Sequence, residues 1–147
     1  MKITQSDYNS LQALPCFKTI VELELLTDGM SHICVKVSTP GQSYLAKKLN
    51  LVTAMTEVYA SLTCASKGLS PRVIYHTEEW LVTEFITGTT LGRSTLKSSE
   101  KISIALSLMA ELHQLPSSKI KQSIPTLDTT QSINCLLMNP ASFSRQT

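Results

Sequence analysis

Apolar and polar residues alternate in three blocks near the start of the chain, and this pattern predicts three consecutive β-strands. The blocks cover residues 19–27, 32–38 and 42–49, and pairs ending in Gly29 and Gly41 separate them. Such pairs favour tight turns. We expect the apolar positions of the first two strands to be buried: Val21, Leu23, Leu25, Ile33, Val35 and Val37. Before them, Tyr8, Leu11 and Leu14 predict a short helical turn against the sheet.

The third block turns one lysine toward an apolar face. Leu45, Lys47 and Leu49 share a face, because successive side chains of a strand alternate. Two interpretations of Lys47 stay open. Its stem can pack on the sheet with the ammonium in water, or the ammonium can hold phosphates beneath the turn that contains Gly29 and Ser31.

Residues 52–67 have apolar side chains at helical spacing and predict an amphipathic helix packed on the sheet. Asn50 or Thr53 is the expected N-cap, and Gly68 the C-cap. Glu57 is the only acid in this helix, near the border of the expected buried face. That face is formed by Met55, Val58, Tyr59, Leu62 and Ala65.

Two more strands are expected at residues 72–75 and 80–86, joined by a tight turn. Short sequential strands with one inserted helix predict an α+β fold built on an antiparallel five-stranded sheet. Gly88 then provides a hinge. We place one domain at 1–88 and a second, incomplete helical part at 89–147.

The second part begins with a predicted helix over residues 100–115, capped by Ser98 or Ser99. Its apolar stripe consists of Ile102, Leu106, Met109 and Leu112 or His113. No second long helix follows, so we expect this stripe to be exposed or covered by a protein partner. Residues 117–147 are rich in Ser and Thr and predict loop.

Composition narrows the functional classes. The 147 residues are 42% hydrophobic, no apolar run approaches the roughly 18 residues of a membrane span, and the N-terminus lacks a signal-peptide pattern. We therefore expect a cytoplasmic protein with no membrane partner. A net charge of +2 without a basic stripe argues against nucleic acid. The four cysteines and three histidines lack metal-ligand spacing, so no metal site is expected.

Several stretches occur in an order that is specific as a set: LTDGMSHICVKV, YLAKKL, the Glu57 helix, LSPRVIYH, LVTEFITGTTL and LHQLP. With them the chain resembles the N-terminal half of the aminoglycoside phosphotransferase and choline kinase superfamily, including its thiamine kinase-like members. The resemblance covers residues 19–116, about two-thirds of the chain. It implies a protein kinase-like N-lobe followed by the first helical part of an incomplete C-lobe.

The resemblance also implies roles for individual residues. Lys47 would contact the α- and β-phosphates of ATP, and Glu57 would hold Lys47 by an ion pair. Gly29 and Ser31 would lie in a turn that covers the phosphates with backbone N–H groups. The plainer alternatives are a solvated acid for Glu57 and an ordinary hairpin turn for residues 28–31.

The adenine would lie against the strand end, with Leu45 above it and Thr83 at the back of its pocket. The Glu84 carbonyl and the Ile86 N–H would pair with its edge. His113 is expected to be structural. No catalytic residue is assigned, because relatives carry a His-Gly-Asp-type loop and metal-binding Asn and Asp residues beyond the LHQLP stretch, and no HGD tripeptide occurs here.

The implied function is an ATP-dependent phosphotransferase that moves the γ-phosphate to a hydroxyl of a small metabolite or aminoglycoside, with ATP and Mg²⁺ as cofactors. Because the catalytic loop is missing, the chain is expected to be a fragment, or an inactive remnant that binds nucleotide or protein. An unrelated α+β domain with the same strand order is the third alternative.

Overall fold

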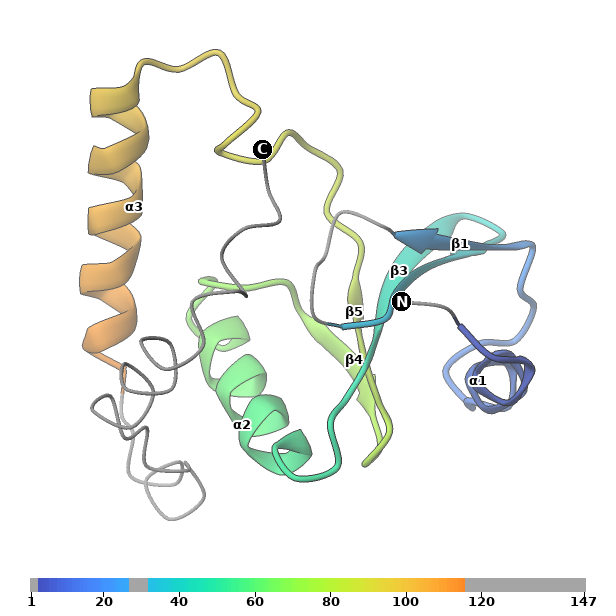
Figure 1. Ribbon diagram of the computed structural model, residues 1–147. Helices are drawn as coiled ribbons and strands as arrows, with labels where there is room; N and C mark the ends of the chain where they lie inside the picture. Colours follow the sequence, from blue (N-terminus) through green and yellow to red (C-terminus); the bar gives the residue numbers. More distant parts are fainter. Residues whose placement is uncertain (1–2, 27–31, 116–147) are drawn as a thin grey trace, which may run out of the picture.

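The computed structural model describes residues 3–26 and 32–115 and shows an α+β fold (Figure 1). Five antiparallel strands form one sheet in the order β1-β2-β3-β5-β4. The strands are β1 (Glu22–Leu26), β2 (Cys34–Thr39), β3 (Gln42–Lys48), β4 (Val73–His76) and β5 (Trp80–Glu84). The helices are α1 (Gln5–Gln12), α2 (Ala54–Ala65) and α3 (Ser98–His113). The predicted five-stranded antiparallel sheet with an inserted helix is therefore confirmed.

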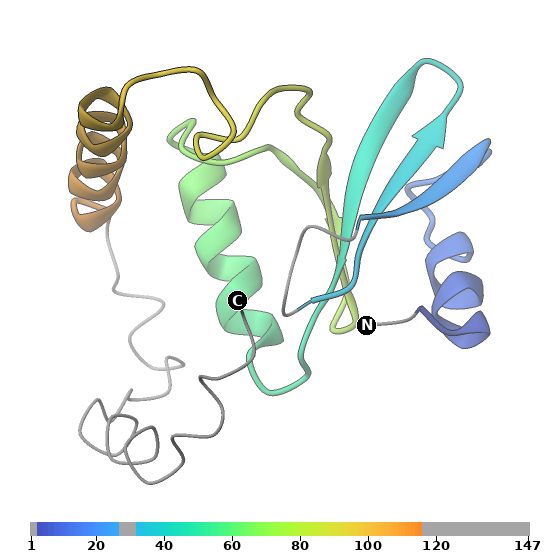
Figure 2. The same ribbon diagram turned by 45° about the horizontal axis from the view of Figure 1, so that its top comes forward.

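The sheet lies between α1 and α2 (Figure 2). Each of its faces carries a core, because successive side chains along a strand point to opposite faces. The larger core, on the α1 face, consists of Leu11, Leu14, Phe17, Ile33, Val35, Val37, Ala46, Trp80 and Val82. The smaller core, beneath α2, consists of Leu49, Ala54, Val58 and Leu81. Ala46 and Leu49 thus lie on opposite faces of the sheet, as the alternation in residues 42–49 predicts.

Two glycines end elements where the sequence predicts. Gly41 closes the β2–β3 turn with φ +95° and Gly68 follows α2 with φ +71°, a region that side chains rarely adopt. At the start of α2, Thr53 holds the N-cap position without a side-chain hydrogen bond. Asn50 accepts the Val52 N–H instead, at 2.9 Å. Both proposed capping residues therefore lie at the helix entrance, and Asn50 makes the side-chain contact.

The predicted burial was wrong at two places. Val21 lies just before β1 and is 69% exposed, so it adds nothing to the core. The face of α2 that meets the sheet carries Ala54 and Val58, while three residues expected there are exposed: Met55, Tyr59 and Leu62. The small Ala54 side chain is 2% exposed beneath the helix, which fits a close approach of α2 to the sheet.

The α3 helix starts and ends two residues earlier than predicted, and its N-cap is Lys97 rather than a serine. The Lys97 N–H donates to the Glu100 carboxylate at 2.8 Å. No residue of α3 is buried, and the stripe of Ile102, Leu106 and Met109 is exposed by 59%, 60% and 50%. The structure therefore agrees with the expectation that this stripe is exposed. A protein partner that covers it stays a prediction.

The predicted loop over residues 117–147 lies outside the described residues. Among the residues that are described, none of the helices combines the length and the apolar character that a membrane crossing requires.

Candidate functional site

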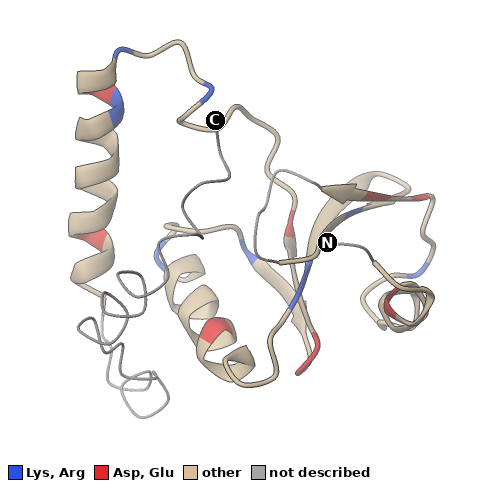
Figure 3. Cartoon of the chain, viewed as in Figure 1, with Lys and Arg blue, Asp and Glu red and all other residues tan. Residues whose placement is uncertain are grey.

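The site begins with an ion pair that joins β3 to α2. Lys47 is the sixth residue of β3, and its ammonium donates to the carboxylate of Glu57 in the first turn of α2. The two side chains are 27% and 24% exposed, so the pair is half-buried. Figure 3 shows the acidic position of α2 and the basic positions of β3 on neighbouring elements. The two residues that the sequence singles out are thus brought together across ten positions of the chain.

Two rows of side chains cross the sheet beside this pair. Lys47 lies between Cys34 of β2 and Leu81 of β5. One row further along, Leu45 lies between Lys36 of β2 and Thr83 of β5. Since the residues of a row are directly paired across antiparallel strands, their side chains share one face. The predicted adenine-lining residues Leu45 and Thr83 are therefore neighbours.

The last residue of β5 and the residues that follow it contain the predicted adenine-pairing groups. The Glu84 carbonyl accepts the Thr83 hydroxyl at 3.3 Å, and the Glu84 carboxylate accepts the backbone N–H of Arg72 at 3.0 Å. The Phe85 N–H donates to the Ser43 carbonyl at 3.2 Å, which ties this segment to β3. Ile86 is 62% exposed. Glu84 and Ile86 therefore lie at the end of the same sheet as Leu45, although the Glu84 carbonyl already has one donor.

The two residues of the predicted phosphate-covering turn, Gly29 and Ser31, lie outside the described residues. The strands that flank this turn are described and pair directly, with Leu26 of β1 opposite Cys34 of β2. The described ends of these two strands therefore lie beside the row that contains Lys47.

Lys36 lies on the same face and was missed from the sequence. Its ammonium is 3.3 Å from a Glu24 carboxylate oxygen and 5.1 Å from the centre of the Phe85 ring. A cation at that distance over an aromatic face is attracted to the ring. The alternation in residues 32–38 was the available signal, since it places Lys36 opposite the buried valines. The row of Leu45 and Thr83, which the resemblance places against the adenine, therefore also contains the charged Lys36 side chain.

Cys34 completes the row beside Lys47. Burial raises the pKa of its thiol, with a smaller lowering from Lys47 and a smaller raising from Glu57. The thiol is therefore protonated at neutral pH and behaves as a small apolar group.

The opposite face of the sheet carries a second ion pair that was also missed. Lys48, the neighbour of Lys47, donates to the carboxylate of Asp7 in α1, and its ammonium is 3.7 Å from Glu79. The Asp7 side chain is 4% exposed and also accepts the Thr4 N–H and hydroxyl at 2.8 and 2.7 Å. The hydrogen bond from Lys48 lowers the pKa of Asp7 to about 2, helped by those from Thr4. The Thr4-x-x-Asp7 spacing of a capping box was the available sequence signal.

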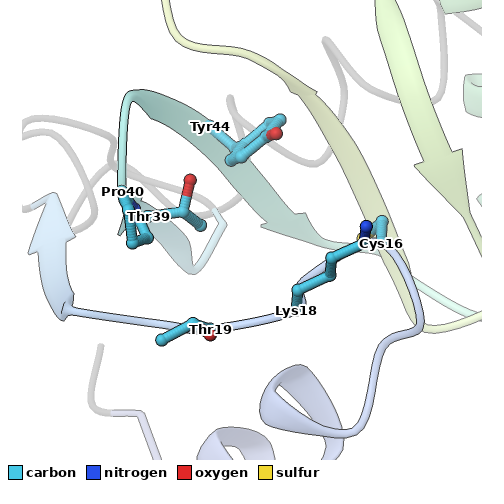
Figure 4. A pocket seen from close by; sticks show the side chains of 6 residues that line it. All are labelled: Cys16, Lys18, Thr19, Thr39, Pro40 and Tyr44. Atoms are coloured by element: carbon cyan, nitrogen blue, oxygen red, sulfur yellow. The ribbon is translucent and has the colours of Figure 1, made fainter.

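Two open cavities lie away from the ion pair of Lys47. One, of about 370 Å³, is lined by Cys16, Lys18, Thr19, Thr39, Pro40 and Tyr44 (Figure 4). Tyr44 belongs to the α1 face, where its ring packs edge-on against the Phe17 ring, with 5.5 Å between the two ring centres. The other, of about 470 Å³, is bordered by Glu84 and Ile86 and by the loop between α2 and β4. Neither of these two cavities reaches Lys47.

Metal ligation was not expected, and residues 3–26 and 32–115 contain no group of three or more His, Cys, Asp or Glu side chains that could hold an ion. Cys16, Cys34 and Cys64 are free thiols.

In comparisons with known proteins, no family model matches this chain, and neither a characterised protein nor a solved structure is significantly similar to it.

Proposed function

We propose that the chain is the nucleotide-binding lobe, with the start of the helical lobe, of an ATP-dependent small-molecule kinase of the aminoglycoside phosphotransferase and choline kinase superfamily. The observation that carries the proposal is the half-buried ion pair between Lys47 on the third strand and Glu57 on α2. Kinase-type lobes need this arrangement of lysine and glutamate before phosphoryl transfer. A surface lysine that only snorkels has no need of such a partner.

The spacing of the two rows supports the proposal. Lys47 and Leu45 are two residues apart on β3, which corresponds to about 6.5–7 Å along a strand. A nucleotide lying along β3, with its base beneath Leu45 and beside Thr83, would extend its phosphates toward Lys47. The Ile86 N–H makes no hydrogen bond within the described part of the chain and would serve as the donor to the base.

The acceptor is proposed from the resemblance alone. It is a hydroxyl of a small, cationic metabolite or of an aminoglycoside. The groups that would bind the acceptor and Mg²⁺ belong to the part of the family pattern that this sequence lacks, so no catalytic step is assigned to its residues.

The test is a calorimetric titration of the chain with ATP and, in parallel, with adenosine. We expect ATP to bind with a Kd in the range of about 1 µM to 1 mM, the usual range for enzyme substrates. Adenosine should bind more weakly, because it has no phosphates to contact Lys47. A folded chain that binds ATP no better than adenosine contradicts the role of Lys47, and one that binds neither contradicts the proposal.

A second candidate function is that of a non-catalytic interaction module. It is favoured by the exposure of α3, where Ile102 and Leu106 are 59% and 60% exposed and would be covered by a partner. Light scattering of the chain with and without Leu106→Glu tests it. We expect self-association or aggregation of the unchanged chain that the charged substitution reduces. A clean monomer in both samples argues against an interaction surface on α3.

A further inference from the structure

The polar cluster behind β3 is built around a buried charge. Asp7 is 3% exposed and is the only charged residue among the described ones that is buried. It belongs to α1, on the face of the sheet opposite α2 (Figure 2). A carboxylate in such a place requires a fixed partner, because an unpaired buried charge is strongly destabilising. Lys48 is that partner.

The cluster is attached to the strand that carries Lys47. Lys47 and Lys48 are adjacent, so their side chains point to opposite faces of the sheet while sharing one stretch of backbone. The Lys48 N–H donates to the Ile33 carbonyl and the Leu49 N–H to the Glu79 carbonyl, each at 2.8 Å. The ion pair of Asp7 and Lys48, which we call the clamp, therefore lies where β3 ends and the chain continues toward α2.

This position places the clamp within the ten-residue span that separates the two members of the candidate site. On one side of it is Lys47, and on the other the chain enters α2 and reaches Glu57. A side chain held at Lys48 limits rotation of the strand end about its own axis. Such rotation would turn the Lys47 side chain away from Glu57.

We propose that Asp7 is a positioning residue for the candidate site: by holding Lys48 on the α1 face, it fixes the end of β3 so that Lys47 meets Glu57 on the α2 face. The N-terminal helix thereby acts on a site that it does not touch. The consequence for nucleotide binding rests on the proposed function, whereas the effect on Lys47 itself does not.

The experiment compares the full chain with its Asp7→Asn variant at a temperature where both are folded by circular dichroism. An amine-acylating reagent is applied, and the labelling rate of Lys47 is measured by mass spectrometry relative to Lys101. Lys101 belongs to α3 and donates to the Gly92 carbonyl, far from the clamp in the sequence. We expect Lys47 to be labelled roughly three- to tenfold faster in the variant, the size typical of coupling within one network.

The matched control is Ser10→Ala. It removes the Ser10 hydroxyl, which accepts from the Trp80 indole at 2.9 Å and donates to the Asp7 carbonyl and the Glu79 carboxylate at 3.1 and 3.4 Å, and it keeps both members of the Asp7–Lys48 ion pair. Its Lys47 labelling should be unchanged even where the chain loses stability. An equal rise in both variants would mean general loosening and would overturn the positioning role, as would an unchanged rate in Asp7→Asn.

A second variant covers the case in which Asp7→Asn fails to fold. The double substitution of Asp7→Asn with Lys48→Gln removes both charges, so no unpaired charge remains buried, and Lys47 should again react faster. An unchanged rate in this variant overturns the inference. Labelling needs no nucleotide, so failure of the unchanged chain to bind ATP would contradict the proposed function and leave the positioning result standing.

Discussion

Lys47→Ala is expected to weaken ATP binding by roughly 10- to 100-fold and to leave adenosine binding nearly unchanged. A hydrogen bond from a charged group contributes about 1.5–3 kcal/mol, which corresponds to that range of affinity. Lys47 is 27% exposed, so solvent screening favours the lower part of the range. Calorimetry with both ligands on the unchanged and substituted chains measures the effect. The difference between ATP and adenosine isolates the phosphate contact from any change in the base site.

The control for this substitution is Lys67→Ala. Lys67 follows α2, is exposed, and carries the same charge away from the sheet. If the loss of ATP affinity came from net charge alone, Lys67→Ala would weaken binding as much as Lys47→Ala. Equal ATP affinity of Lys47→Ala and the unchanged chain would remove the phosphate-binding role of Lys47.

Asp7→Asn is expected to lower the free energy of unfolding at neutral pH by about 2 kcal/mol, with a smaller effect in acid. The pKa of Asp7 is lowered from 3.8 to about 2 in the folded chain, mainly by the hydrogen bond from Lys48. The unfolded chain therefore takes up the proton first as the pH falls. The stabilisation is present above about pH 5 and is lost between there and about pH 2. Urea unfolding of both chains at pH 7, 4.5 and 3 measures the difference.

Lys48, the partner of Asp7, also stabilises the folded chain at neutral pH. The hydrogen bond that Lys48 donates to Asp7 raises the pKa of Lys48, so the contribution of Lys48 to stability is complete at neutral pH and is lost only as the pH rises through that raised pKa. Glu78→Gln is the matched control, because Glu78 is exposed in the turn between β4 and β5. It should change stability by no more than about 0.5 kcal/mol. A pH-independent difference between the unchanged chain and Asp7→Asn would contradict the assignment of the charge to Asp7.

Much of the sheet could be predicted because its signal is local. Alternation in residues 19–49 identifies the first three strands and places Lys47 on the face of Leu45 and Leu49, as observed. The error at α2 has a physical cause. The helix carries an apolar row of large side chains beside a row of smaller ones, and hydrophobicity alone favoured the large row that contains Met55 and Tyr59. Val58, which was expected on the buried face, and the small Ala54, which was not, meet the sheet.

The residues missed from the sequence all depend on distant pairing. Asp7 and Lys48 are 41 positions apart, and Lys36 becomes part of the candidate site only through the register that sets it opposite Leu45. Local sequence patterns do not show which distant residues become partners. Lys47 and Glu57, in contrast, are only ten positions apart in the sequence. The implied family, ATP binding and the adenine contacts of Thr83, Glu84 and Ile86 stay predictions for the experiments above to decide.

The two edge strands of the sheet, β1 and β4, each have features that disfavour pairing with a further strand, and these features differ. At one end, β1 exposes Glu22 and Glu24, and like charges brought together across two copies would repel. At the other, β4 is only four residues long and its pairing with β5 shifts register between Val73 and Tyr75. Short and irregular outer strands are poor templates for fibril growth. Both edges therefore disfavour association by strand addition, which would extend the hydrogen-bonded ladder of the sheet.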